Sequence, residues 1–138
     1  MAARHPLVRL EVLALVAIGG FAGSNLRYLA SLFVPGIGGT LLVNVLGSFA
    51  LGFLLYEAIH SDILSGRSRL LLGSGFLSSF TTYSTFVVET VQSAPLVAVG
   101  YVAASYALGF GAVLAGRSAA LRVDAGTDTT AAGEGGAP

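Results

Sequence analysis

Residues 75–86 read GFLSSFTTYSTF and lie within a long apolar segment, residues 70–92, in which Glu89 is the single charged residue. These twelve residues hold six Ser or Thr hydroxyls and four aromatic rings. Hydrocarbon offers no water to such groups, so a membrane helix must satisfy them within the protein. Either the hydroxyls bond back to carbonyls of their own helix, or they line a polar path.

The composition around this stretch is that of a membrane protein. The chain has 138 residues, of which 54% are hydrophobic and 10% charged, and its mean hydropathy is +0.82. A soluble domain carries about 25% charged residues, which these values do not approach. The absence of cysteine excludes disulfides and thiolate chemistry. A net charge of zero without any lysine argues against a nucleic-acid partner.

Four segments are long and apolar enough to cross a bilayer, which takes about 20 residues. They are residues 12–34, 40–59, 70–92 and 96–116, and their short connections predict that consecutive helices are antiparallel neighbours. Asn25 and Arg27 stand where a signal-peptide cleavage site would fall, so we expect the first span to be retained. Residues 1–119 are predicted to form one four-helix transmembrane domain. Residues 120–138, acidic and rich in small residues, are predicted to form a disordered tail.

Each predicted span carries a stripe of polar or small residues on one face. Such stripes are costly against lipid, and four helices enclose little space. We therefore expect the polar faces to be covered by a second copy or a partner. The stripes are Gly19 and Gly23; Asn44, Ser48 and Gly52; Thr82, Phe86 and Glu89; and Tyr101, Ser105 and Gly109.

The chemistry of the stripes favours an anion over a cation. A cation path needs carboxylates or converging carbonyls, and Glu89 is taken here as the interior carboxylate of the spans. Hydroxyls, the Asn44 amide and the Arg27 guanidinium are donors. Tyr83 and Phe86 lie three residues apart and face the same way, and their ring edges carry the positive end of the aromatic quadrupole. The pattern predicts a path for a small, hard anion.

Three ordered motifs resemble the Fluc (CrcB) fluoride channels. GFLSSFTTYSTF is similar to the third-helix signature of that family, GGFAGSNLRY (residues 19–28) to the first-helix motif, and GTLLVNVLGSFALG (residues 39–52) to the second-helix motif. The resemblance covers all four spans in order. It implies an all-α membrane protein built as an antiparallel dimer of four-helix subunits, in which the third helix is broken in mid-membrane.

The resemblance also implies roles for individual residues. Backbone carbonyls at Ser78 and Thr81 would hold one structural Na⁺ at the dimer interface. The rings of Tyr83 and Phe86 and the amide of Asn44 would flank fluoride in the pore. The polar track along the pore wall matches Ser84, Thr85, Glu89, Tyr101 and Ser105, and the vestibule arginine matches Arg27.

The implied activity is passive export of cytoplasmic fluoride across the cell membrane, giving fluoride resistance without any enzyme chemistry. Two departures from the family pattern leave an alternative open. Ser78-Ser79 replaces a glycine pair, so the break must form without the freedom of glycine at positive φ, and Tyr83 replaces a phenylalanine. The chain could then be a non-conducting or half-conducting subunit of a heterodimeric channel. A small proton-coupled multidrug exporter is a weaker alternative, because Glu11 lies too near the end of the first span.

The arginines predict one-way insertion with both termini cytoplasmic. Positive residues in short loops face the cytoplasm, and a protein that inserts both ways needs little bias. The expected partner is therefore a paralogous subunit of opposite orientation. On one side lie Arg4, Arg9, Arg67, Arg69, Arg117 and Arg122, and on the other at most Arg27.

Overall fold

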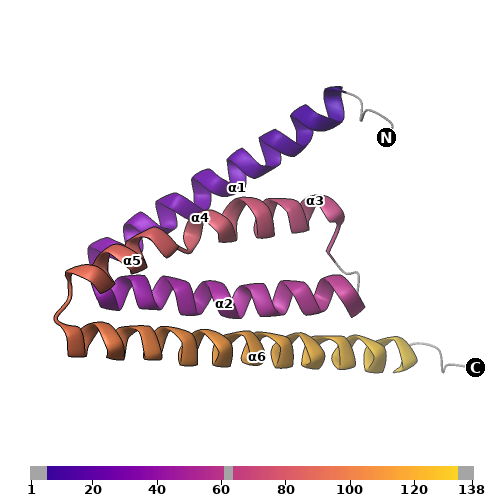
Figure 1. Cartoon of the computed structure of the whole chain (residues 1–138). Coiled ribbons are helices and arrows are strands. Elements are labelled where there is room, and N and C mark those ends of the chain that lie inside the picture. Colours follow the sequence, from indigo (N-terminus) through magenta and orange to yellow (C-terminus); the bar gives the residue numbers. More distant parts are fainter. Residues whose placement is uncertain (1–5, 61–63, 134–138) are drawn as a thin grey trace, which may run out of the picture.

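The structure is a computed structural model that describes residues 6–60 and 64–133, so Arg4 and the last five residues lie outside the described part. These residues are all helical or in short connections, without any strand, which confirms the all-α prediction. The elements are α1 (Pro6–Phe33), α2 (Ile37–His60), α3 (Gly66–Arg69), the π-helical η1 (Leu70–Leu77), α4 (Ser78–Phe80), α5 (Tyr83–Gln92) and α6 (Pro95–Gly133), shown in Figure 1.

Within the described residues, three helices are long and apolar enough to cross a membrane: Leu7–Phe33, Ile37–His60 and Pro95–Val123. They coincide with three of the four predicted spans. The segment predicted as the remaining span, residues 70–92, is divided among η1, α4 and α5, so it contains no single helix of that length. The hydroxyl-rich stretch lies where this segment is divided.

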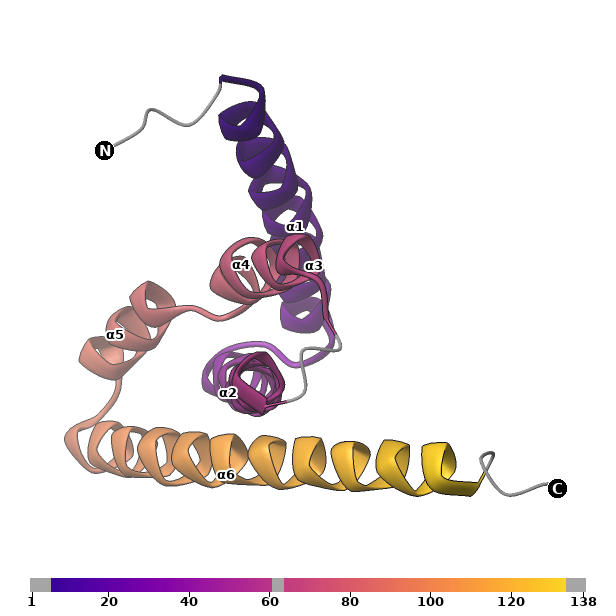
Figure 2. The same ribbon diagram turned by 90° about the vertical axis from the view of Figure 1, so that its right-hand side faces the viewer.

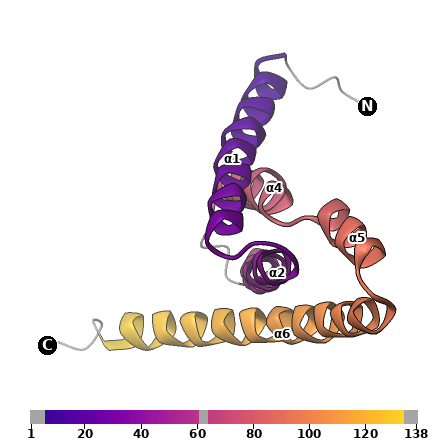
Figure 3. The same cartoon turned by 90° about the vertical axis from the view of Figure 1, so that its left-hand side faces the viewer.

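Packing does not follow the order of the chain. Consecutive helices were predicted as neighbours, but the most extensive contacts join α1 to η1 and α2 to α6. Figure 2 shows α2 end-on with α6 crossing beneath it, and α1 leaning against η1 and α4. Figure 3 shows α5 at the corner where the chain turns into α6.

Glycines determine these pairings. A Cβ at Gly19 would overlap the backbone of Leu71 and lie 2.8 Å from Phe76 N, and one at Gly23 would lie 3.1 Å from Phe80 N. The prediction that Gly19 and Gly23 permit close helix contact is confirmed. Two more glycines allow the same close approach where α2 and α6 cross. A Cβ at Gly52 would overlap the backbone of Val113, and one at Gly116 would overlap that of Phe49.

A glycine and a proline account for the turns from α1 into α2 and from α5 into α6. Among the described residues, Gly36 is the one glycine at positive φ (70°), in the PGIGG connection between α1 and α2. That conformation suits glycine because it has no Cβ. Pro95 is the first residue of α6, where the N–H it lacks would have no helical partner.

The chain has little apolar core of its own. Val43, Leu77 and Phe80 are buried, whereas large apolar side chains such as Phe33 and Leu96 are 84% and 86% exposed. Exposed apolar side chains carry no penalty against hydrocarbon, so a membrane helix need not bury them. What the fold must hide is polar, and the polar groups gather around the divided segment.

The last helix is longer than predicted. The span was expected to end near Gly116 and a disordered tail to begin at residue 120, but α6 continues to Gly133. Residues 117–122 read RSAALR, and Ala, Leu and Arg are strong helix formers, so the end of the apolar run does not end the helix.

A polar cavity around an interrupted helix

The interruption consists of two threonines in extended backbone. α4 ends at Phe80, Thr81 has φ −79° and ψ 160°, Thr82 has φ −146° and ψ 123°, and α5 begins at Tyr83. Ser78, by contrast, is helical with φ −64° and ψ −27°. The break therefore needs no residue at positive φ, and the loss of the glycine pair at Ser78-Ser79 does not prevent it. β-branched threonine suits the extended conformation.

Hydroxyls bond to the backbone at the interruption and in the turn before it. Thr82 is the N-cap of α5, and its Oγ1 accepts a hydrogen bond from Thr85 N at 3.2 Å. Thr81 Oγ1 donates to Leu77 O at 2.9 Å, and Ser78 Oγ donates to Gly75 O at 3.1 Å. An N-cap such as Thr82 stabilises a helix end by about 1 kcal/mol. Bonding back to the helix therefore accounts for part of the hydroxyl-rich stretch.

Asn44 ties α2 to the interruption by two hydrogen bonds. Its Nδ2 donates to Thr82 O at 2.9 Å, and its Oδ1 accepts from Thr82 N at 2.8 Å. The amide thus pairs with the backbone of Thr82 as a neighbouring strand would. The sequence predicted an anion donor here. The structure adds a second role, because one N–H and the oxygen hold the interruption and one N–H of the amide remains.

The same bonds release two backbone carbonyls. In an unbroken helix, Thr82 N would donate to Ser78 O and Thr85 N to Thr81 O. Both N–H groups are used elsewhere, the first by Asn44 Oδ1 and the second by Thr82 Oγ1. The interruption likewise takes the helical donors from Ser79 O and Phe80 O, so Ser78 and Thr81, whose carbonyls the resemblance implies as cation ligands, are two of four carbonyls that lose them.

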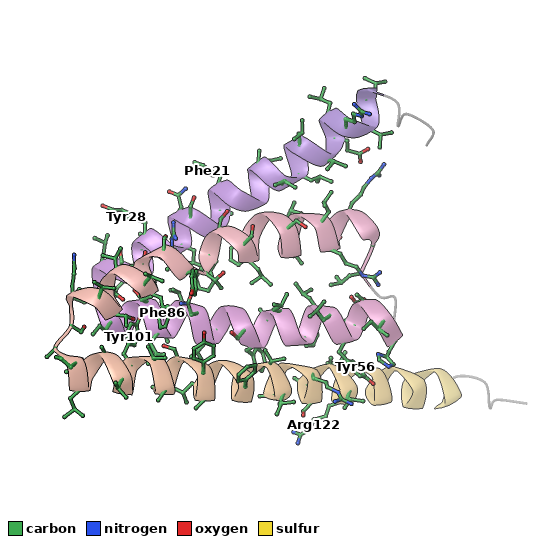
Figure 4. All side chains as sticks on the ribbon, in the orientation of Figure 1. Phe21, Tyr28, Tyr56, Phe86, Tyr101 and Arg122 are labelled. Carbon is green, nitrogen blue, oxygen red and sulfur yellow. The ribbon has the colours of Figure 1, made fainter. Side chains whose placement is uncertain are left out.

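A cavity of about 320 Å³ brings together side chains from α2, α5 and α6. The rings of Tyr83 and Phe86 lie 5.8 Å apart by their centroids. Four of the predicted pore residues, Asn44, Tyr83, Phe86 and Ser105, thus share one cavity, and Figure 4 shows Phe86 and Tyr101 in the same region between α5 and α6. The full lining is Asn44, Ser48, Tyr83, Phe86, Ser105, Tyr106, Gly109, Phe110 and Val113.

Glu89 and Tyr101 form a pair behind Phe86. The buried Tyr101 hydroxyl donates to Glu89 Oε2 at 2.9 Å, and the Tyr101 and Phe86 ring centroids lie 5.1 Å apart at a 54° tilt. Neither residue lines this cavity or the two that adjoin it, and Tyr101 reaches this one only through the contact of its ring with Phe86. The pair therefore supports Phe86 from behind.

The other predicted residues lie in two adjoining cavities. Ser78 and Thr81 line one of about 400 Å³, and Arg27 and Thr85 line another of about 290 Å³. Ser84 is outside all three, with its Oγ 3.4 Å from Thr82 Oγ1. Thr82 lines the 400 Å³ and the 290 Å³ cavities, and Asn44 lines the 320 Å³ and the 400 Å³ cavities. The interruption and its partner Asn44 therefore connect the three cavities.

One buried acid was missed. Glu57, in the last turn of α2, is 3% exposed, although the sequence interpretation took Glu89 as the interior carboxylate. Its Oε1 accepts from Leu64 N at 2.5 Å, and its Oε2 lies 3.3 Å from Arg69 Nε. The sequence feature that could have indicated this pair is Arg69, which follows Glu57 by twelve residues across a short connection. This pair holds α3 against the end of α2.

Fold and site together define a helical multi-pass membrane protein with a donor-lined cavity beside an interrupted helix. The family described as CrcB-like protein, Camphor Resistance (CrcB), matches residues 14–117. The chain is 60% identical over 117 residues, 85% of this chain and 91% of the relative, to "Fluoride-specific ion channel FluC 1" of Haloarcula marismortui. It is 52% identical over 108 residues, 78% of this chain and 84% of the relative, to "Fluoride-specific ion channel FluC 2" of Halobacterium salinarum. The chain belongs to the CrcB family.

Proposed function

We propose that the chain is a fluoride-selective ion channel subunit that lets cytoplasmic fluoride leave the cell passively. One observation carries this proposal: Asn44, Ser105, Tyr83 and Phe86 line one cavity beside the interrupted helix, in a chain whose relatives are named fluoride-specific ion channels. These relatives are channels, so the chain falls in a class of channels and not of enzymes.

Selectivity would come from the kind of donors in this cavity. Fluoride is small and strongly hydrated, so a path must replace its water with close donors. The free N–H of Asn44 and the Ser105 hydroxyl supply hydrogen bonds, and the Phe86 ring offers its positive edge. Every donor is neutral, so the ion is not trapped. An inside-negative potential then favours export by about 2.3 kcal/mol per 100 mV.

The working unit would be an antiparallel dimer in the cell membrane. A single chain leaves its polar cavities at its surface, and a second subunit would cover them. The arginine bias predicts that this chain inserts one way, with both termini cytoplasmic, so a paralogue of opposite orientation would complete the dimer. Relatives with numbered names, FluC 1 and FluC 2, support the idea of two related subunits.

A Na⁺ ion would fit at the interruption. The released carbonyls of Ser78 and Thr81 are hard oxygen donors, the kind that hard cations prefer. Bound there, Na⁺ would offset the negative ends of these carbonyls where two subunits meet. If so, replacing Na⁺ by a large organic cation should lower the thermal stability of the purified dimer. Equal stability in both salts would remove the ion from the proposal.

The test of the function is fluoride efflux from liposomes that hold the purified channel. A fluoride electrode should record release on dissipation of the charge gradient, with chloride retained. The chain alone should be compared with the chain purified with any subunit that accompanies it. Efflux in the second case alone supports a heterodimer. Proton-dependent uptake of organic cations without fluoride efflux would favour an exporter and overturn the proposal.

A further inference from the structure

Aromatic rings line the 320 Å³ cavity from two helices, although the site described so far uses the rings of one. Tyr83 and Phe86 come from α5. Tyr106 and Phe110, on α6, line the same cavity, and their ring centroids lie 6.2 Å apart at a 31° tilt. The two pairs have nearly the same spacing.

The α6 pair flanks the polar stripe of its own helix. Ser105 and Gly109 lie on that stripe, and Tyr106 and Phe110 each follow one residue later, so the rings stand beside the stripe. Gly109 has no side chain, and a Cβ placed there would be 3.7 Å from Ser48 Oγ. Gly109 therefore approaches Ser48 of α2 closely, and both line the cavity beside the two rings.

Tyr106 and Phe110 are 55% and 68% exposed in the single chain, but the depth of Tyr106 argues against a ring that simply faces lipid. It lies eleven residues into α6, roughly 16 Å along the helix at 1.5 Å per residue, near the middle of a span. Membrane tyrosines concentrate at the interfaces, where water reaches the hydroxyl. Within the described part of the chain, the Tyr106 hydroxyl makes no hydrogen bond. In hydrocarbon that group would be unsatisfied, whereas in the cavity it can donate to an ion or to water.

We propose that Tyr106 and Phe110 form a second aromatic wall of the fluoride path. The Phe110 ring edge and the Tyr106 hydroxyl face the ion from α6, opposite the donors of α5. This inference rests on the proposed function and assigns residues that the motifs do not contain. It also accounts for four rings at a cavity that needs neutral donors on more than one side.

The experiment compares fluoride efflux of Phe110→Ile and Tyr106→Phe with that of the unchanged channel, each purified with any accompanying subunit. Phe21→Ile is the matched control, since Phe21 on α1 is about as exposed as Phe110 (74% against 68%) but lines none of the three cavities. Phe110→Ile removes a ring edge and is expected to slow efflux about tenfold. Tyr106→Phe keeps the ring, removes one donor, and is expected to lower fluoride-over-chloride selectivity. Elution as a single species checks assembly of each variant.

The outcomes separate this inference from the proposed function. Phe86→Ile is measured alongside as the α5 reference. Slow efflux for Phe86→Ile, with Phe110→Ile as fast as Phe21→Ile and unaltered selectivity in Tyr106→Phe, would overturn the second wall and leave the channel standing. No fluoride efflux from the unchanged channel would overturn both. If Phe110→Ile fails to assemble, the selectivity of Tyr106→Phe decides the question.

Discussion

Replacing Asn44 should damage stability as well as transport, because its amide holds the interrupted helix. Asn44→Ala removes both partners of Thr82, a residue only 7% exposed. Each backbone group left unsatisfied costs about 1–3 kcal/mol, so the variant should lose roughly 2–6 kcal/mol. Asn44→Asp keeps the acceptor for Thr82 N but sets a carboxylate oxygen against Thr82 O. It should lose at least half as much, because repulsion between the two oxygens adds to the lost hydrogen bond, and its charge should also repel fluoride.

The assay is thermal unfolding of the purified channel, run beside fluoride efflux. Ser48→Ala is the control, since Ser48 lines the same cavities but makes no side-chain hydrogen bond within the described residues. The unchanged chain and Ser48→Ala are expected to be more stable than both Asn44→Asp and Asn44→Ala. If the Asn44→Ala channel is as stable as the Ser48→Ala control but shows no efflux, Asn44 does not hold the interrupted helix and acts only on the ion in the pore.

Four further predictions test other parts of the molecule. Phe86→Ile should cut fluoride efflux while changing stability by about 1 kcal/mol, because apolar bulk is kept; equal losses of both would make the ring mere packing. Tyr101→Phe should reduce efflux by leaving the Glu89 carboxylate without its donor, and Glu89→Gln combined with it should restore part of the loss. Arg69→Met should destabilise by about 3 kcal/mol, more than Glu57→Gln, since it leaves a carboxylate that is 4% exposed without its guanidinium. Tags on the two termini should be accessible from the cytoplasm alone, and labelling from both sides would contradict one-way insertion.

Local patterns were enough to predict the elements and the identity of most site residues. Apolar runs of about 20 residues predicted three of the helices. The concentration of hydroxyls marked the segment in which the helix is interrupted. The spacing of Gly19 and Gly23 predicted a close contact, although not that the third segment is the partner. These features depend on residues near one another in the chain.

The rest depends on contacts between distant residues. The pairing of Asn44 with Thr82 spans 38 positions, and nothing in either motif indicates that an amide would replace a helical hydrogen bond. The burial of Glu57 likewise follows from Arg69 folding back across a connection. The sequence also required the break to form without the glycine pair, but did not show how. Extended threonines with a hydroxyl cap interrupt the helix without any residue at positive φ.

The way the helix is interrupted bears on how a fluoride path could select its ion. A glycine hinge would let α4 and α5 move, whereas Thr82 is fixed through its N–H, its carbonyl and its hydroxyl together. Selecting a small ion from larger ones requires donors whose positions change little when the larger ion enters. The first turn of α5 carries Tyr83 and Phe86, so any shift of Thr82 would carry both rings with it. Asn44 therefore stabilises the ring positions through the backbone, and Tyr101 stabilises Phe86 from the other side by ring contact.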